Sequence, residues 1–224
     1  MIGPASSLPL LAWGTVVGVD LVSFPQGMLS RPLVAAAVAG AIAGDLGAGL
    51  RVGVVLELFA LDMLPIGASR YPDFGPGAVA AAALAAGLPW HDGLGLAALL
   101  GLVMALVGGR TMILLRRVNG GRVRRAEPVL AAGDPGTIRR LQWQGVASDA
   151  VRSVLLTGLG LWLVGPIRQA GLALPDAGRS LTLVAIGGGL VAAFVGMLRR
   201  AGRGDPLRWV GLGLLTGGVI AWLS

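Results

Sequence analysis

The chain has 224 residues, 55% of them hydrophobic, and a mean hydropathy of +0.80, which is too apolar for an ordinary soluble domain. It contains no cysteine, which excludes disulfides, thiolate nucleophiles and thiolate metal sites. Its net charge of +7 comes from 18 arginines and no lysine, and the arginines gather between apolar stretches, where membrane topology explains them better than nucleic-acid binding. We therefore expect an all-α polytopic membrane protein that binds no nucleic acid.

Residues 1–115 are expected to form a membrane region with interrupted helices. The first apolar run has no basic residue ahead of it, so it is a poor signal peptide and is expected to stay in the mature protein. Its end, "VDLVSFPQGMLSRPLV", places Asp20, Ser23, Gln26 and Arg31 around a proline and a glycine. This pattern predicts a helix broken at membrane depth. The polar groups suit the lining of a site for a polyhydroxylated ligand and the cap of a half-helix equally well.

The stretch from residue 31 to about residue 90 does not divide into full membrane crossings. Its apolar pieces, 33–44, 50–61 and 77–88, are each about a dozen residues long and are separated by prolines and glycines. Because about 20 residues are needed to cross the hydrocarbon core, these lengths predict short broken or re-entrant half-helices. Such backbone is tolerated where protein or a water-filled cavity satisfies its polar groups, so it often marks a transport site.

Four carboxylates lie in or beside these short apolar pieces. A carboxylate at the centre of a membrane helix costs roughly 2.5–3.5 kcal/mol on insertion scales, so it usually faces a cavity or a partner charge. Glu57 lies among aliphatic residues, where it serves either a polar solute or a structural pair with Arg51 or another helix. Asp45 and Asp73 lie in turn-forming stretches, which predict caps or turns. Asp62 fits a position at the membrane interface, but its role does not follow from the sequence.

The carboxyl-terminal half has clearer spans, which we expect at 93–115, 151–167, 180–198 and 209–223. Residues 116–150 are predicted to be a hydrophilic, Arg-rich loop, and the positive-inside rule places this loop and the link 199–208 on the cytoplasmic side. Residues 151–224 then form a membrane region with three spans. The single histidine, His91, has no evident orienting partner and is not expected to be catalytic.

Residues 23–73, "SFPQGMLSRPLVAAAVAGAIAGDLGAGLRVGVVLELFALDMLPIGASRYPD", resemble the signature region of a known family. The matching elements are RPLV, the small-residue helix ending in GDL, the following G-x-x-x-G-x-x-x-E-L, and IGA before PD. Their order and spacing resemble subunit IIC, the membrane permease, of the mannose, fructose and sorbose family of the bacterial sugar phosphotransferase system. Two stretches downstream, "IRRLQWQGVASDAVRSVLL" and "GMLRRAGRGDPLRWVGLGLLTGG", resemble the same family more weakly.

The resemblance implies a transport subunit that is not an enzyme on its own. We expect no cofactor and no metal site, because the chain has no cysteine, a single histidine and no acid pair at metal-ligand spacing. Its implied partners are a sugar, a second membrane subunit IID, and the cytoplasmic phosphocarrier proteins IIA and IIB, whose histidines pass the phosphoryl group to the sugar. The implied assembly is a trimer of IIC and IID pairs in the bacterial cytoplasmic membrane, with an elevator-like motion of a substrate-carrying core.

Carried over by position, Glu57 and Asp73 match the acids of the family's E-L and P-D elements. Gln26 and Asp20 fall in the family's polar amino-terminal segment. The resemblance therefore predicts these four residues as the sugar-binding groups, acting as acceptors or donors to sugar hydroxyls.

The chain also departs from the family pattern. It is shorter than typical members, and four positions differ from what the family leads us to expect: Pro65, Arg70, Tyr71 and Gln142. These changes keep open a different sugar, or a repurposed membrane scaffold or regulatory homologue that does not transport. A proton-coupled transporter of small solutes, with Glu57 as the titrating acid, is a further alternative. Neither the sugar nor the role of Arg70 follows from the sequence.

Overall fold

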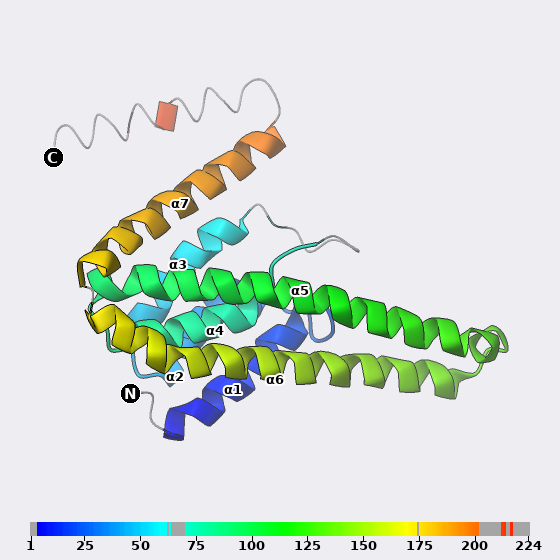
Figure 1. Ribbon diagram of the computed structural model, residues 1–224. Helices are drawn as coiled ribbons and strands as arrows, with labels where there is room; N and C mark the ends of the chain where they lie inside the picture. The colour runs from blue at the N-terminus through cyan, green and yellow to red at the C-terminus, as the bar shows by residue number, and fades with distance from the viewer. Residues whose placement is uncertain are drawn as a thin grey trace.

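The computed structural model describes residues 4–61, 63, 70–173, 175–201, 212, 213 and 216. Throughout these residues the regular secondary structure is helical. In chain order the helices are α1 (Pro4–Asp20), α2 (Pro32–Ile42), α3 (Leu46–Ala60), α4 (Phe74–Ala85), α5 (Trp90–Ala131), α6 (Pro135–Ala173) and α7 (Pro175–Ala201). Figure 1 shows the short helices of the amino-terminal half gathered against one end of the long α5 and α6 pair.

Helices α2 and α3 form a tight antiparallel hairpin. At 11 and 15 residues they are shorter than the roughly 20 residues that cross a membrane, as the sequence predicted. The two backbones touch because the facing residues are glycines: a Cβ atom on Gly49 would lie 2.3 Å from the carbonyl oxygen of Ala36. The predicted cap is confirmed, since Asp45 Oδ1 accepts a 2.8 Å hydrogen bond from the backbone N–H of Ala48 at the start of α3.

Helix α4 lies in the centre of the molecule, and all twelve of its residues are buried. It packs on α5, α6, α2, α3 and α1. A charged side chain lies at each end of α4. Asp73 precedes its first residue, and at the other end the guanidinium of Arg168 donates hydrogen bonds of 2.7–3.2 Å to the carbonyl oxygens of Ala83, Leu84 and Ala86. These signs match the helix dipole, which favours a carboxylate at the start and a cation at the end.

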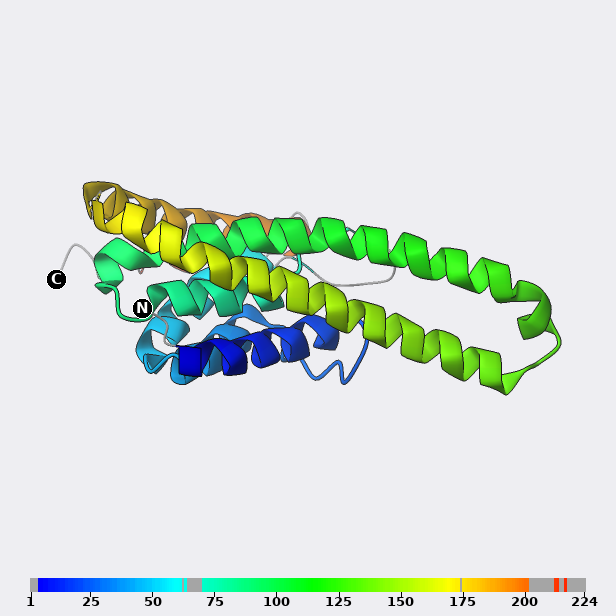
Figure 2. The same cartoon turned by 60° about the horizontal axis from the view of Figure 1, so that its bottom comes forward.

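The hydrophilic stretch 116–150 is not a loop. Helix α5 continues to Ala131, the connection is residues 132–134, and α6 begins at Pro135. The expectation of a loop was wrong because the arginines mark the end of an apolar span but do not stop a helix, whereas Gly133, with φ +78°, and Pro135 do. The resulting hairpin projects beyond the other helices (Figures 1 and 2). Its cytoplasmic location stays a prediction.

Three helices of the described chain are long and apolar enough to cross a membrane: Trp90–Ala131, Pro135–Ala170 and Ala177–Arg199. They contain the predicted spans 93–115, 151–167 and 180–198. The predicted span 209–223 lies outside the described residues except at 212, 213 and 216. The combination of long spans with short, buried half-helices confirms the predicted all-α polytopic membrane fold.

Candidate functional site

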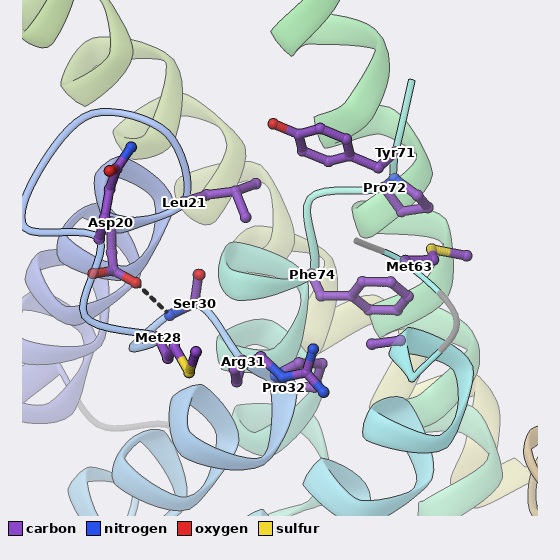
Figure 3. Close-up of a pocket in the computed structure, with 12 residues that line it drawn as sticks. Asp20, Leu21, Met28, Ser30, Arg31, Pro32, Met63, Tyr71, Pro72 and Phe74 are labelled. Atoms are coloured by element: carbon purple, nitrogen blue, oxygen red, sulfur yellow. Dashed lines mark hydrogen bonds between the residues drawn. The ribbon is translucent and has the colours of Figure 1, made fainter. Parts of the chain in front are cut away.

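A cavity of about 350 Å³ lies where two helix breaks meet. One wall is the segment that joins α1 to α2, and the other is the segment that leads into α4. Figure 3 shows Asp20, Leu21 and Ser30 facing Met63, Pro72 and Phe74 across this space. The residues with polar or aromatic groups in its lining are Asp20, Gln26, Ser30, Arg31, Tyr71 and Phe74.

Asp20 ends α1 and organises the segment that follows it. Its Oδ1 accepts a 2.6 Å hydrogen bond from the backbone N–H of Gly27, and its Oδ2 accepts a 2.9 Å bond from that of Ser30. An ionised carboxylate offers about four acceptor positions, so two remain after these bonds. Asp20 therefore joins the two interpretations that the sequence left open: it fixes a helix break and also lines the cavity.

Gln26 also lines the cavity, at the outer side of the same segment. Its amide nitrogen donates a 3.0 Å hydrogen bond to the carbonyl oxygen of Val22. Gln26 and Met28 have φ angles of +59° and +62°, a left-handed backbone conformation that residues other than glycine rarely adopt. Residues with strained backbone persist only where the surrounding structure holds them in place, and they are often found at ligand sites.

Glu57 meets Arg31, not Arg51. It forms an ion pair with the Arg31 guanidinium, and its other oxygen accepts a 3.1 Å hydrogen bond from the backbone N–H of Leu33 at the start of α2. The carboxylate thus joins α3 to the first turn of α2, where the helix dipole favours a negative charge. Arg31 lines the cavity and Glu57 lies behind it, so Glu57 orients a cavity residue in this arrangement.

Asp73 is fully buried in a charge network that the sequence reasoning missed. Its Oδ2 accepts a 2.8 Å hydrogen bond from Arg152, which also donates at 2.9 Å to Asp149 one turn earlier on α6. The hydroxyl of Ser23 completes the network with a 2.6 Å bond to Asp149. Two carboxylates and one guanidinium therefore tie both helix breaks to α6. The signal in the sequence was the i, i+3 acid and base pair of Asp149 and Arg152, at the point where the hydrophilic stretch 116–150 meets the apolar span that follows it.

The structure does not bring the four predicted sugar-binding residues together. Asp20 and Gln26 lie in the cavity lining, Glu57 lies behind Arg31, and the Asp73 carboxylate points into the network with Arg152 while its neighbours Pro72 and Phe74 face the cavity. That any of them contacts a sugar stays a prediction. Asp62 and Pro65 lie outside the described residues.

The aromatic wall of the cavity is positioned by a further arginine. Arg116 of α5 donates a 2.6 Å hydrogen bond to the Tyr71 hydroxyl, and its guanidinium carbon lies 5.1 Å from the centre of the Tyr71 ring. This contact holds the tyrosine against α5. At the other end of α5, His91 lies 3.4 Å from Asp92, which also pairs with Arg179 of α7. In the described part of the chain no three His, Cys, Asp or Glu side chains are grouped so as to hold a metal ion.

The family model for the PTS system sorbose-specific IIC component matches residues 6–201. The chain belongs to this family. It is a multi-pass membrane protein of the bacterial cytoplasmic membrane, and it is an IIC component of the mannose, fructose and sorbose group, which agrees with the resemblance seen in its sequence.

Curated relatives match parts of the chain. The fructose permease IIC component of Bacillus subtilis (strain 168) is 27% identical over 148 residues, which are 66% of this chain and 54% of the relative. The mannose-specific EIIC component of Escherichia coli (strain K12) is 28% identical over 118 residues, 53% of this chain and 42% of the relative. The matches thus span about half the length of these relatives.

Two solved structures share the fold. A chain described as "Structure of membrane protein" superposes with a TM-score of 0.79 at 20% identity and covers 97% of this chain and 88% of its own length. A chain of the mannose transporter ManYZ in complex with microcin E492 gives a TM-score of 0.64 at 20% identity, with 97% and 87% covered. At this identity the likeness shows the arrangement of helices.

Proposed function

We propose that the chain is the sugar-translocating subunit of a mannose-family phosphotransferase system and that it binds a hexose-type sugar in the cavity between the two helix breaks. The observation that carries this proposal is the cavity itself, set among short helices in a chain of the IIC family. Its volume of about 350 Å³ falls in the range of roughly 300–1,000 Å³ typical of small-molecule sites.

The chemistry of the lining supports a polyhydroxylated ligand. Asp20 has acceptor positions to spare, while the Ser30 hydroxyl and the Arg31 guanidinium add donors. Phe74 supplies an apolar face for the carbon skeleton of a sugar ring. Sugars carry many hydroxyls around such a skeleton, so acceptors, donors and an apolar face in one cavity match them.

Transport then requires partners that the chain does not contain. We propose a membrane partner of the IID type and cytoplasmic IIA and IIB phosphocarriers that phosphorylate the sugar, with assembly into a trimer of IIC and IID pairs. One of the structural neighbours is a chain of the mannose transporter ManYZ, which supports a second membrane subunit. The candidate sugars are those in the relatives' names: fructose, mannose and sorbose.

Uptake by cells tests the proposal. The chain and its candidate partners are expressed together in a host lacking its own transporters for these sugars, and uptake of each radiolabelled sugar is measured. We expect uptake that requires the phosphocarriers and that falls about three- to tenfold with Gln26→Ala, which removes a neutral hydrogen-bonding group. Gln144→Ala, an exposed position on α6, is the matched control and leaves uptake unchanged. Accumulation driven by a pH gradient without phosphocarriers would contradict the proposal.

A further inference from the structure

A second cavity, of about 540 Å³, lies on the other side of Tyr71 and Pro72, which line both cavities. Its lining differs in charge from that of the first cavity. Three arginines, Arg70, Arg110 and Arg117, face it together with apolar side chains of α5 such as Leu106 and Ile113. No carboxylate residue lines this space within the described part of the chain.

The backbone brings these arginines together. Arg110 and Arg117 are seven residues apart, two turns of α5, and so lie on one face of that helix. Arg70 joins them because its segment runs directly along α5. A Cβ atom on Gly109 would lie 2.5 Å from the carbonyl oxygen of Tyr71, and the N–H of Asp73 donates a 2.9 Å hydrogen bond to the carbonyl of Ala105. Glycine at position 109 is what permits this approach.

The three arginines have no acidic partner among the residues that the structure describes. The arginine that lines the first cavity differs, because Arg31 pairs with Glu57. Guanidinium groups that line one cavity give it a positive electrostatic potential, which favours the binding of an anion. The planar, multiple donors of arginine match phosphate oxygens particularly well.

The length of α5 is consistent with a phosphate at the second cavity. Helix α5 begins at Trp90 and is long and apolar enough to cross a membrane, and a crossing of about 20 residues that starts with the helix ends near Arg110, where lipid headgroups and water begin. A phosphate there keeps its charge near water while an attached apolar part contacts Leu106 and Ile113.

We propose that Arg70, Arg110 and Arg117 form a phosphate-binding site beside the sugar cavity. The phosphate belongs either to a soluble sugar phosphate or to the headgroup of an anionic phospholipid. The first source rests on the proposed transport function, whereas the second does not. The site also gives a role to Arg70, one of the positions at which this chain departs from the pattern of its family.

Binding to the purified full-length chain tests this proposal. In nanodiscs of phosphatidylcholine, calorimetry measures the affinity for fructose 6-phosphate, with unphosphorylated fructose as the comparison ligand. In nanodiscs that also contain phosphatidylglycerol, native mass spectrometry counts the retained anionic lipid. The variants are Arg110→Gln and Arg117→Gln, and Arg125→Gln is the control because Arg125 is exposed on the same helix outside this cavity.

We expect Arg110→Gln and Arg117→Gln each to weaken phosphate binding about tenfold, the effect of losing one charge-assisted hydrogen bond, while Arg125→Gln has little effect. Loss in the fructose 6-phosphate measurement assigns the site to a soluble sugar phosphate, and loss confined to phosphatidylglycerol assigns it to a headgroup. The proposal is overturned if the unsubstituted chain binds neither, if both variants bind like the unsubstituted chain, or if Arg125→Gln weakens binding equally. Because none of these readouts requires sugar uptake, a failure here is distinct from a failure of the transport function.

Discussion

Charged side chains are used differently around the helix breaks of α1–α4 and in the projecting hairpin of α5 and α6. Around the breaks each carboxylate that the structure describes has a specific structural partner. Asp20 and Asp45 bind backbone N–H groups, Glu57 binds the start of α2, and Asp73 binds a buried arginine. In the hairpin most arginines are exposed, as at Arg117, and the helices continue past them without interruption.

The difference shows why charge inside the apolar region need not mark a ligand directly. A short helix that ends at membrane depth leaves backbone N–H and C=O groups that water cannot reach, and these must find partners. Asp45 and Arg168 meet such groups at the ends of α3 and α4. The cavity lies where two such breaks face each other. A residue such as Asp20 both binds backbone N–H groups and lines the cavity.

The largest expected effect is at Arg152, which joins the helix breaks to α6. Arg152→Met leaves Asp73 and Asp149 buried without their cation, and breaking a buried ion pair in this way typically costs about 3–5 kcal/mol. Thermal unfolding in detergent should show a large loss of stability. Arg125→Met, on the exposed face of the hairpin, is the control and should stay within about 0.5 kcal/mol.

Adding Asp73→Asn and Asp149→Asn to the Arg152→Met chain should recover part of the lost stability, because no charge is then left unpaired in the network. Equal melting temperatures for Arg152→Met and Arg125→Met would contradict the proposed difference between the buried charges around the helix breaks and the exposed arginines of the hairpin.

A smaller effect is expected from the helix caps, which occur in both regions. Asp45 caps α3 beside the helix breaks, and Asp134 caps α6 at the tip of the hairpin through a 2.8 Å bond from the Thr137 N–H. Asp45→Ala should cost about 1 kcal/mol of global stability. Asp134→Ala should change only local hydrogen exchange near the tip, because few contacts surround it.

The effect of Asp134 should also depend on pH. The hydroxyl and backbone N–H of Thr137 hold the pKa of the Asp134 carboxyl below its usual value. Its stabilising contribution is therefore present above the ordinary aspartate pKa of about 4 and is lost as the pH falls through the lowered value. Hydrogen exchange of the tip, compared between Asp134→Ala and the unsubstituted chain, should differ at pH 7 and converge in acid. A difference that persisted at low pH would contradict this role.

Much of the fold could be predicted from the sequence, because apolar length and the positions of proline and glycine report directly on where helices can run. The cap at Asp45 and the break after Asp20 followed from local chemistry. The link from Arg152 to Asp73 did not, because it joins positions 79 residues apart that only the packed structure brings together. The pairing of Glu57 with Arg31 was hidden for the same reason. The hairpin does not follow from charge, because arginine is a good helix former and a run of arginines does not distinguish a loop from a helix.

The central claim, that the sugar binds between the two helix breaks, can be tested directly because the chain has no cysteine. Ser30→Cys places a single thiol in the cavity, and Ser180→Cys places one on the exposed start of α7. The rate of alkylation of each is measured with and without fructose, mannose and sorbose. We predict that at least one of these sugars slows alkylation at position 30 and leaves position 180 unchanged. If none of the three sugars protects position 30, or if both positions are slowed alike, the sugar does not bind in this cavity.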